Sequence, residues 1–204
     1  MIKVILFDCD GVIIKERGQY FSQRLAQELG LPINENFVKE FFKKEFLLCE
    51  TGKADLKEEL QKKIGTWGYT GSVDELIRYW FEGEAELVPA VVEKIKGLRN
   101  RGIKCFVSTN NEKYRTEYLW NVVGLKNFMD GIFSSSFLGV FKSDLEFWQK
   151  AFEQLPDYDK LEVLVVDNNE QMLKKAKEFG FQTEFYENFE DFKKVMNEKY
   201  KLNV

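Results

Sequence analysis

Two aspartates, two positions apart, follow a short apolar run near the start of the chain. The run spans residues 4–7, and Asp8 and Asp10 come directly after it. Side chains two apart on an extended chain point the same way, so Asp8 and Asp10 share a side and Cys9 faces away. A wholly apolar run is typical of a strand buried on both faces of a parallel sheet. We therefore expect two carboxylates at the carboxyl end of a central strand, where open α/β sheets bind ligands.

Three further groups of polar residues follow predicted strands. They are Thr109 and Asn110 after residues 103–107, Lys142 in the loop after residues 132–134, and Asp167 and Asn168 after residues 163–166. Because the carboxyl ends of parallel strands meet at one edge of a sheet, we expect all three groups to lie near the two aspartates.

This set suits an attack by a carboxylate on a phosphate ester. Two anions repel each other, so the attack needs a divalent cation and a fixed ammonium. Oxygen ligands from Asp8, Asp167 and the backbone carbonyl of Asp10 would suit Mg²⁺. Lys142 would neutralise phosphate charge and orient Asp8.

The remaining polar groups have matching uses. Thr109 and the Asn110 amide would donate hydrogen bonds to phosphoryl oxygens, which gain charge in the transition state. Asp10 would protonate the leaving oxygen and later deprotonate the water that cleaves the aspartyl-phosphate. A structural interpretation stays open beside this one, since Thr109, Asp167 and Asn168 could simply cap the helices that follow them.

The length, composition and net charge of the chain limit the classes of partner that we expect it to bind. The chain has 204 residues, 44% of them hydrophobic and 31% charged, which is typical of one globular domain or one domain carrying a smaller insert. The formal net charge is -4, unlike the basic face that nucleic-acid binding usually needs, and no apolar run is as long as a membrane span. We expect a small phosphorylated molecule as the partner, and neither nucleic acid nor a membrane.

The counts of two residue types add to this. The chain has no histidine, which excludes Ser-His-Asp hydrolases, Cys-His proteases, histidine phosphatases and most zinc enzymes. Three scattered cysteines form neither a disulfide framework nor a zinc pattern, and Met1 leads straight into the first strand without a signal peptide. We expect a cytoplasmic protein.

From about residue 86, predicted helices and short apolar strands alternate. Helices are expected from Pro89 to Gly102, at 112–123, after Asp144, at 170–179 and at 189–200, with a further strand at 183–186. Strand–helix units of this length predict an α/β fold with a doubly wound parallel sheet.

Residues 15–85 break that alternation, with helical patterns and no convincing strand. We expect a core at 1–14 and 86–204 and an inserted all-helical cap at 15–85, over the end of the first strand. The aromatic residues of this segment recur at helical spacing and are mostly core, although one or two could line a substrate pocket; they are Phe41, Phe42, Phe46, Trp67, Tyr69, Tyr79, Trp80 and Phe81.

The same residues resemble the motifs of the haloacid dehalogenase superfamily, nearly from end to end. The matching stretches are DCDGV at 8–12, CFVSTN at 105–110, GVFKSDLEFWQKA around Lys142 and VLVVDNNEQML around Asp167. GLKNFMDGIFSSSFLGVFKSD resembles the segment before the lysine in the phosphatase-like branch, and the helical insert resembles the first-type cap of this superfamily. Each motif alone is weak, but four in order at strand ends are specific.

The resemblance implies a Rossmann-like core, with Asp8 as the nucleophile and Asp10 as the acid and base. It implies Mg²⁺ bound by Asp8, the Asp10 carbonyl and Asp167. The expected activity is hydrolysis of a small phosphomonoester through an aspartyl-phosphate intermediate. One departure is the fourth motif, where Asn168 stands in place of a second acid; this predicts weaker Mg²⁺ binding or, at the extreme, lost activity.

Three alternatives remain open at this stage. A phosphosugar mutase would use the same core residues and pass the phosphoryl group to a second hydroxyl. A dehalogenase is disfavoured by Asp10, which dehalogenases of this family generally lack. A binding protein that kept the fold without activity is the interpretation that Asn168 motivates.

Overall fold

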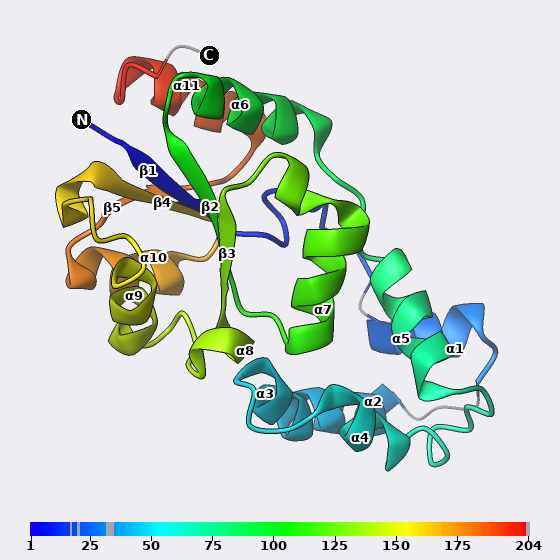
Figure 1. The fold of residues 1–204 in the computed structure, drawn as a ribbon. Helices are drawn as coiled ribbons and strands as arrows, with labels where there is room; N and C mark the ends of the chain where they lie inside the picture. The colour runs from blue at the N-terminus through cyan, green and yellow to red at the C-terminus, as the bar shows by residue number, and fades with distance from the viewer. Residues whose placement is uncertain (17, 20, 32–34, 203–204) are drawn as a thin grey trace.

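A parallel sheet forms the centre of the molecule. The computed structural model describes residues 1–16, 18–19, 21–31 and 35–202. In this part of the chain the sheet has five strands, which are β1 (Val4–Phe7), β2 (Lys104–Thr109), β3 (Gly131–Ser134), β4 (Val163–Asp167) and β5 (Gln182–Phe185). Their order is β3-β2-β1-β4-β5 and all neighbours are parallel, so β1 is central, as expected (Figure 1).

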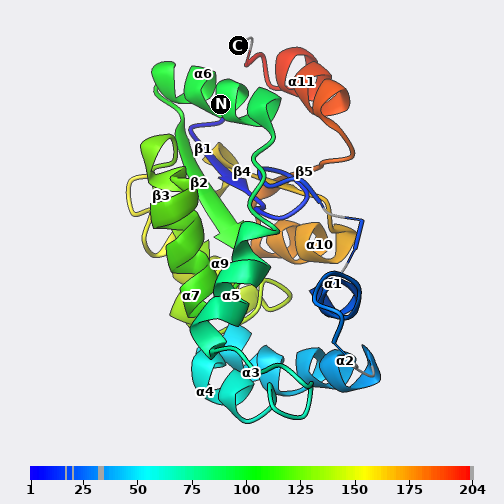
Figure 2. The same ribbon diagram turned by 90° about the vertical axis from the view of Figure 1, so that its right-hand side faces the viewer.

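Helices cover both faces of this sheet, which confirms the doubly wound α/β prediction. The helices that follow β1 in the core are α6 (Pro89–Asn100), α7 (Lys113–Tyr118), α8 (Ser135–Leu138), α9 (Leu145–Phe152), α10 (Glu170–Phe179) and α11 (Phe189–Glu198), with short turns η1 (Leu119–Val123), η2 (Leu125–Asn127) and η3 (Lys160–Glu162). Helices α6 and α11 lie on one face, and α9 and α10 on the other (Figure 2).

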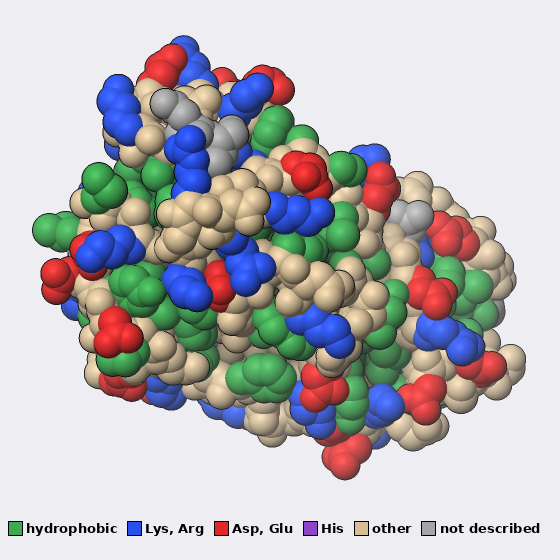
Figure 3. All heavy atoms as spheres, turned by 45° about the horizontal axis from the view of Figure 1, so that its top comes forward, with side chains coloured by type: hydrophobic (Ala, Val, Ile, Leu, Met, Phe, Trp, Pro, Cys, Tyr) green, Lys and Arg blue, Asp and Glu red, His purple; other side chains and the backbone are tan. Residues whose placement is uncertain are grey.

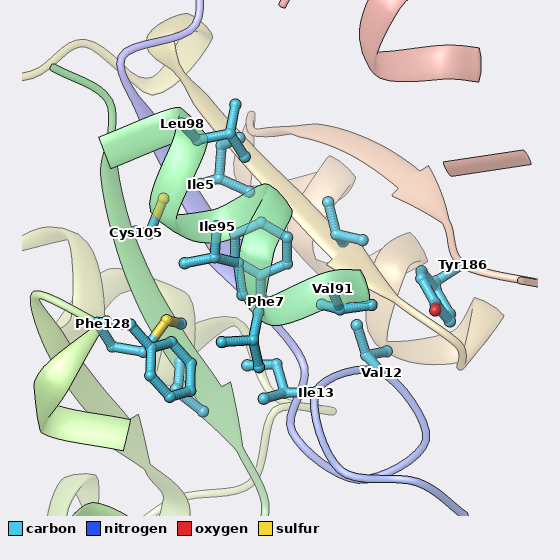
Figure 4. Close-up of a cluster of buried hydrophobic side chains, with 14 of the residues drawn as sticks. Ile5, Phe7, Val12, Ile13, Val91, Ile95, Leu98, Cys105, Phe128 and Tyr186 are labelled. Atoms are coloured by element: carbon cyan, nitrogen blue, oxygen red, sulfur yellow. The ribbon is translucent and has the colours of Figure 1, made fainter. Parts of the chain in front are cut away.

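Alternation along β1 divides its side chains between the two faces. Ile5 and Phe7 pack in one buried cluster with Val91 and Ile95 of α6, as Figure 4 shows. Val4 and Leu6 pack in the other cluster, under α9 and α10. Because all four side chains of the strand are buried, the end of β1 is a fixed platform for the residues that follow it.

Between β1 and α6 the described residues form helices and no strand. These are α1 (Phe21–Glu28), α2 (Glu35–Lys43), α3 (Glu45–Glu50), α4 (Leu56–Gln61) and α5 (Val73–Glu82). They enclose an apolar cluster of their own and lie beyond the carboxyl ends of the strands (Figure 1). Residues 17, 20 and 32–34 of the expected cap lie outside the described residues, and the division at 14 and 85 stays a prediction.

The helix starts differ from the capping alternative that the sequence left open. Thr109 belongs to β2, where it pairs with Ser134, and Glu112 caps α7 by accepting hydrogen bonds from two backbone N–H groups. Asn169 caps α10, rather than Asp167 or Asn168. The structural alternative that these residues cap the following helices does not hold, because the Thr109 hydroxyl accepts a hydrogen bond from Asn111 and the Asp167 carboxylate is paired with Lys142.

Two other helices differ in detail from the sequence prediction. The helix expected at 112–123 is α-helical only to Tyr118 and continues as a π-helical turn, η1, that ends at Gly124 in the left-handed conformation. Asp144 precedes α9 as expected, but its side chain makes no capping hydrogen bond.

The surface shows acidic and basic side chains interspersed over the face seen in Figure 3. None of the helices in the described residues is both long and apolar enough to span a bilayer. Cys9, Cys49 and Cys105 are all free and buried.

Candidate active site

Asp8 begins the site at the end of the central strand. Its backbone N–H donates a hydrogen bond to the carbonyl oxygen of Val166 at 2.8 Å, so the residue is held in line with the sheet. Asp167 ends the neighbouring strand β4 and is fully buried. The two carboxylates thus come from adjacent parallel strands and meet at one edge, as the sequence predicts.

Lys142 connects these two carboxylates. Its ammonium nitrogen, Nζ, lies 2.6 Å from Asp8 Oδ1 and 2.6 Å from Asp167 Oδ2. The side chain is only 3% exposed, so this ion triad lies at low dielectric constant, where each charge depends on the others.

The backbone of Lys142 is fixed at both ends. Its N–H donates to Asn110 Oδ1 at 2.9 Å, and its carbonyl accepts from Trp148 Nε1 at 3.0 Å. Asn110 was expected to donate to a phosphoryl group through its amide; in the structure its amide oxygen holds the loop that carries the lysine, which leaves the amide nitrogen for that expected use.

The charges of the triad shift one another. Burial and, to a smaller extent, the negative charge of Asp167 raise the pKa of Asp8 to about 6, against the opposing effect of Lys142. Burial lowers the pKa of Lys142, but the attraction of the two carboxylates outweighs burial and raises that pKa overall. The lysine therefore stays cationic beside Asp8.

Asp10 lies in the turn that follows and is the more accessible acid. Its side chain is 53% exposed, whereas that of Asp8 is 14% exposed. Asn111 donates from Nδ2 to Asp10 Oδ2 at 3.0 Å and to Thr109 Oγ1 at 2.7 Å. One amide thereby ties the Asp10 carboxylate to the buried hydroxyl at the end of β2.

Arg115 holds the same carboxylate from the other side. Its Nη2 lies 3.2 Å from Asp10 Oδ1, and its guanidinium also donates to the carbonyl oxygens of Phe81 and Glu84, just at the end of α5. The side chain is 5% exposed. A single buried cation therefore links Asp10 to the helical segment.

The donors that could hold a metal are all oxygens. They are the carboxylates of Asp8 and Asp167, which share one ammonium, and the backbone carbonyl of Asp10. Within the described residues no three acidic, thiol or imidazole side chains gather around one point, so a carbonyl must complete any such set. Oxygen donors of this kind fit Mg²⁺, which retains several waters.

Asn168 lies beside this set, with its Nδ2 3.5 Å from the Asp10 carbonyl oxygen. Gly11 has a φ of +84°, and a Cβ placed on it would be 2.2 Å from Asn168 Nδ2. The turn therefore requires glycine for two reasons, the left-handed backbone and the close approach of the amide.

The structure brings all the expected site residues to one edge of the sheet: Asp8, Asp10, Thr109, Asn110, Lys142 and Asp167. Sequence reasoning missed two others. Neither Asn111 nor Arg115 was among the residues expected in the site. The only feature of the sequence that points to these two residues is their place in the chain, shortly after the polar residues at the end of β2.

A cleft of about 500 Å³ opens beside Asp10. Its other described walls come from the loop after β1 and from helices α1, α2 and α5. The site thus faces a space enclosed by both parts of the chain.

Comparison with known proteins identifies relatives of this arrangement. A model of the haloacid dehalogenase-like hydrolase family matches residues 2–180. No curated protein matches the chain.

Several solved structures have the same fold. A HAD family enzyme from Bacteroides thetaiotaomicron, in complex with magnesium and inorganic phosphate, is 18% identical with a TM-score of 0.77, over 94% of this chain and 99% of that one. A HAD-like family hydrolase from Porphyromonas gingivalis is 19% identical with a TM-score of 0.76, over 97% and 99%.

A more distant match is L-2-haloacid dehalogenase from Xanthobacter autotrophicus with chloropropionic acid covalently bound. It is 21% identical with a TM-score of 0.61, over 90% of this chain and 76% of that one. At identities this low, the likeness shows the fold alone.

Proposed function

Because the chain belongs to the haloacid dehalogenase-like hydrolase family, we propose that it is a Mg²⁺-dependent phosphatase of small phosphomonoesters that works through an aspartyl-phosphate. The observation that carries the proposal is the Lys142 ammonium, 2.6 Å from both Asp8 and Asp167, with the exposed Asp10 carboxylate two residues away. A buried carboxylate fixed by an ammonium is a positioned nucleophile, and an accessible neighbouring acid is a proton donor.

In the first step an Asp8 carboxylate oxygen attacks phosphorus. A bond forms between that oxygen and phosphorus, and the bond from phosphorus to the ester oxygen breaks. The leaving oxygen takes a proton from Asp10, which becomes a carboxylate. Lys142 offsets the negative charge that gathers around Asp8 and the phosphoryl group.

In the second step water attacks phosphorus and gives its proton to Asp10. The bond between phosphorus and Asp8 breaks, which releases inorganic phosphate and restores the free carboxylate of Asp8 and the protonated Asp10. Asn111 and Arg115 hold the Asp10 carboxylate in place through both proton transfers.

Thr109 and Asn110 remain the proposed donors to the phosphoryl oxygens. The Thr109 hydroxyl accepts from Asn111, so its own proton is available to donate. Asn110 uses its oxygen for the Lys142 backbone, which orients its NH₂ group as a donor.

Mg²⁺ would be held by Asp8, the Asp10 carbonyl and Asp167, where it would supply positive charge for the transferring phosphoryl group. The Bacteroides enzyme of the same fold was crystallised with magnesium and phosphate, which supports this choice of ion. The helices between residues 15 and 85 act in the proposal as a cap that limits water and selects the leaving group. The free cysteines agree with a reducing compartment such as the cytoplasm.

The test is hydrolysis of p-nitrophenyl phosphate with and without Mg²⁺, in the wild type, in Asp8→Asn and in the exposed-surface control Asp157→Asn. The proposal predicts turnover that needs Mg²⁺, is lost in Asp8→Asn and is retained in Asp157→Asn. Turnover that survives in Asp8→Asn would overturn the assignment of the nucleophile. Absence of phosphate release from this ester and from a panel of alkyl and sugar phosphates would overturn the phosphatase function.

A further inference from the structure

The cleft beside Asp10 lies where a leaving group would sit. Asp10 lines it, and in the proposed reaction Asp10 protonates the ester oxygen that departs. The volume of about 500 Å³ is within the range of small-molecule sites and exceeds that of a phosphate group. The shape of this space therefore bears on the alcohol part of the substrate.

The walls of the cleft are mainly apolar. Ile14 comes from the loop after β1, and Phe21, Phe42 and Trp80 come from α1, α2 and α5. Phe21 and Trp80 are stacked with ring centroids 4.7 Å apart, and Phe42 meets Trp80 edge to face at 5.3 Å. Phe42 is only half-buried, so its ring presents surface to the cleft.

The described charged residues that line the cleft balance in sign. Three lysines and three acids line it: Lys15, Lys39, Lys43, Asp10, Glu16 and Glu84. Lys15 and Glu84 already have partners within the protein. Lys15 lies 3.1 Å from Glu86, and Glu84 accepts from Trp80 Nε1 at 2.9 Å. The described part of the wall therefore offers no net positive charge to a second anionic group on a ligand.

We propose that the alcohol released by this enzyme has an apolar body the size of a ring, rather than the polyhydroxyl body of a sugar. This rests on the proposed phosphatase function. An apolar ring buries its surface mainly against Phe42, the half-buried ring of this wall. Sugar hydroxyls placed against the same ring faces lose water there, and a ring face offers them no comparable hydrogen-bond partner.

The first test compares benzyl phosphate with glucose 6-phosphate, since each joins a six-membered ring to phosphate through one primary carbon. We expect kcat/KM for benzyl phosphate to be higher by about tenfold or more, the size of effect that apolar contacts give in specificity pockets. Equal values, or a preference for the sugar phosphate, would overturn the proposal.

A pair of variants locates the effect. Phe42→Leu removes a ring that lines the cleft, while Phe46→Leu removes a half-buried ring of the same aromatic cluster, 4.9 Å from Phe42, that does not line it. We expect Phe42→Leu to reduce the preference for benzyl phosphate by about fivefold and Phe46→Leu to leave it unchanged. Equal changes in both variants would assign the effect to packing and overturn the proposal.

A binding measurement separates this proposal from the phosphatase function. Titration calorimetry compares benzylphosphonate with methylphosphonate in the Mg²⁺-loaded wild type. Binding of benzylphosphonate that is at least about tenfold tighter supports the apolar cleft even if no ester is hydrolysed, and then only the phosphatase function fails. Equal affinities would overturn the apolar cleft even if esters are hydrolysed.

Discussion

The guanidinium of Arg115 lies 3.2 Å from the Asp10 carboxylate while it also binds two carbonyl oxygens at the end of α5. The connection from the helical segment back to the core therefore begins at the same cation that positions the proposed acid. One side chain thus holds both the Asp10 carboxylate and the end of α5.

Replacing Arg115 should impair catalysis more than ground-state binding. We expect Arg115→Met to lower kcat by about tenfold or more with a smaller change in KM, because the Asp10 carboxylate loses a fixed partner. Arg78→Met, an exposed arginine of α5, is the matched control and should leave kcat unchanged. An unchanged kcat in Arg115→Met, measured on a folded protein, would contradict this role.

Removing the ammonium of the buried triad should affect both activity and stability. Lys142→Met leaves Asp8 and Asp167 close together without the cation between them. We expect turnover to fall by about 10²-fold or more and the free energy of unfolding at pH 8 to fall by about 3 kcal/mol. Steady-state kinetics and urea denaturation measure the two effects, with Lys96→Met, in an exposed pair with Glu93, as the control. Wild-type turnover in Lys142→Met would exclude the lysine from the mechanism.

Alanine variants at two glycines with similar backbone angles distinguish the effect of backbone strain from an effect on catalysis. Gly11 has φ +84° and faces the Asn168 amide, whereas Gly102 has φ +82° and open space around it. Alanine at either position should cost about 1–2 kcal/mol of stability through the left-handed backbone. Only Gly11→Ala should also lower kcat and weaken Mg²⁺ binding, since it displaces the turn that carries the Asp10 carbonyl. Equal kinetic effects of the two variants would contradict this account of the turn.

Glu112 should make stability depend on pH. Burial raises its pKa to about 7 from the ordinary 4.5, against two backbone N–H donors, and the charge of Asp55 adds to the rise. The folded state then holds the proton more tightly than the unfolded state, so this stabilisation is complete below pH 4.5 and is lost as pH rises through about 7.

The variant Glu112→Gln keeps an acceptor oxygen for the helix cap and cannot ionise. Relative to the wild type, its free energy of unfolding should be nearly unchanged at pH 4 and higher by about 2 kcal/mol at pH 8. Urea denaturation at both pH values measures this, with the exposed Glu93→Gln as the control. If Glu112→Gln is instead less stable than the wild type at pH 8, the folded state holds the ionised Glu112 without a free-energy cost, which contradicts this account.

The strands and the ends of the strands were predictable because the signal is local. An apolar run followed by a polar residue marks the edge of a parallel sheet, and this placed Asp8, Thr109 and Asp167 without any tertiary information. The helix at Pro89 was equally local, since proline in the first turn needs no partner for its missing N–H.

The predictions that failed concern side chains whose partners are set by contacts in the folded structure. The sequence left Thr109 open as a cap for the helix that follows it. In the structure the Thr109 hydroxyl accepts from Asn111 and its backbone pairs with β3, and Glu112 caps α7 instead. Arg115 reaches Asp10 across 105 positions of sequence, which no local spacing reveals.

The aromatic residues of the helical segment show the same limit. Phe42 and Phe46 have the same helical spacing and pack in one cluster, yet only Phe42 lines the cleft beside Asp10. That distinction arises from how α2 faces the loop after β1.

The most direct test of the central claim is to trap the covalent intermediate on Asp8. The Asp10→Asn variant is mixed with p-nitrophenyl phosphate and Mg²⁺, because p-nitrophenolate departs without a proton whereas the water step needs a base, so the aspartyl-phosphate accumulates. Acid quenching and reduction with borohydride convert an acyl phosphate to homoserine, which peptide mass spectrometry locates. The account predicts homoserine at position 8 and none in Asp8→Asn. Release of p-nitrophenolate with an unmodified Asp8, or with the label on another residue, would contradict it.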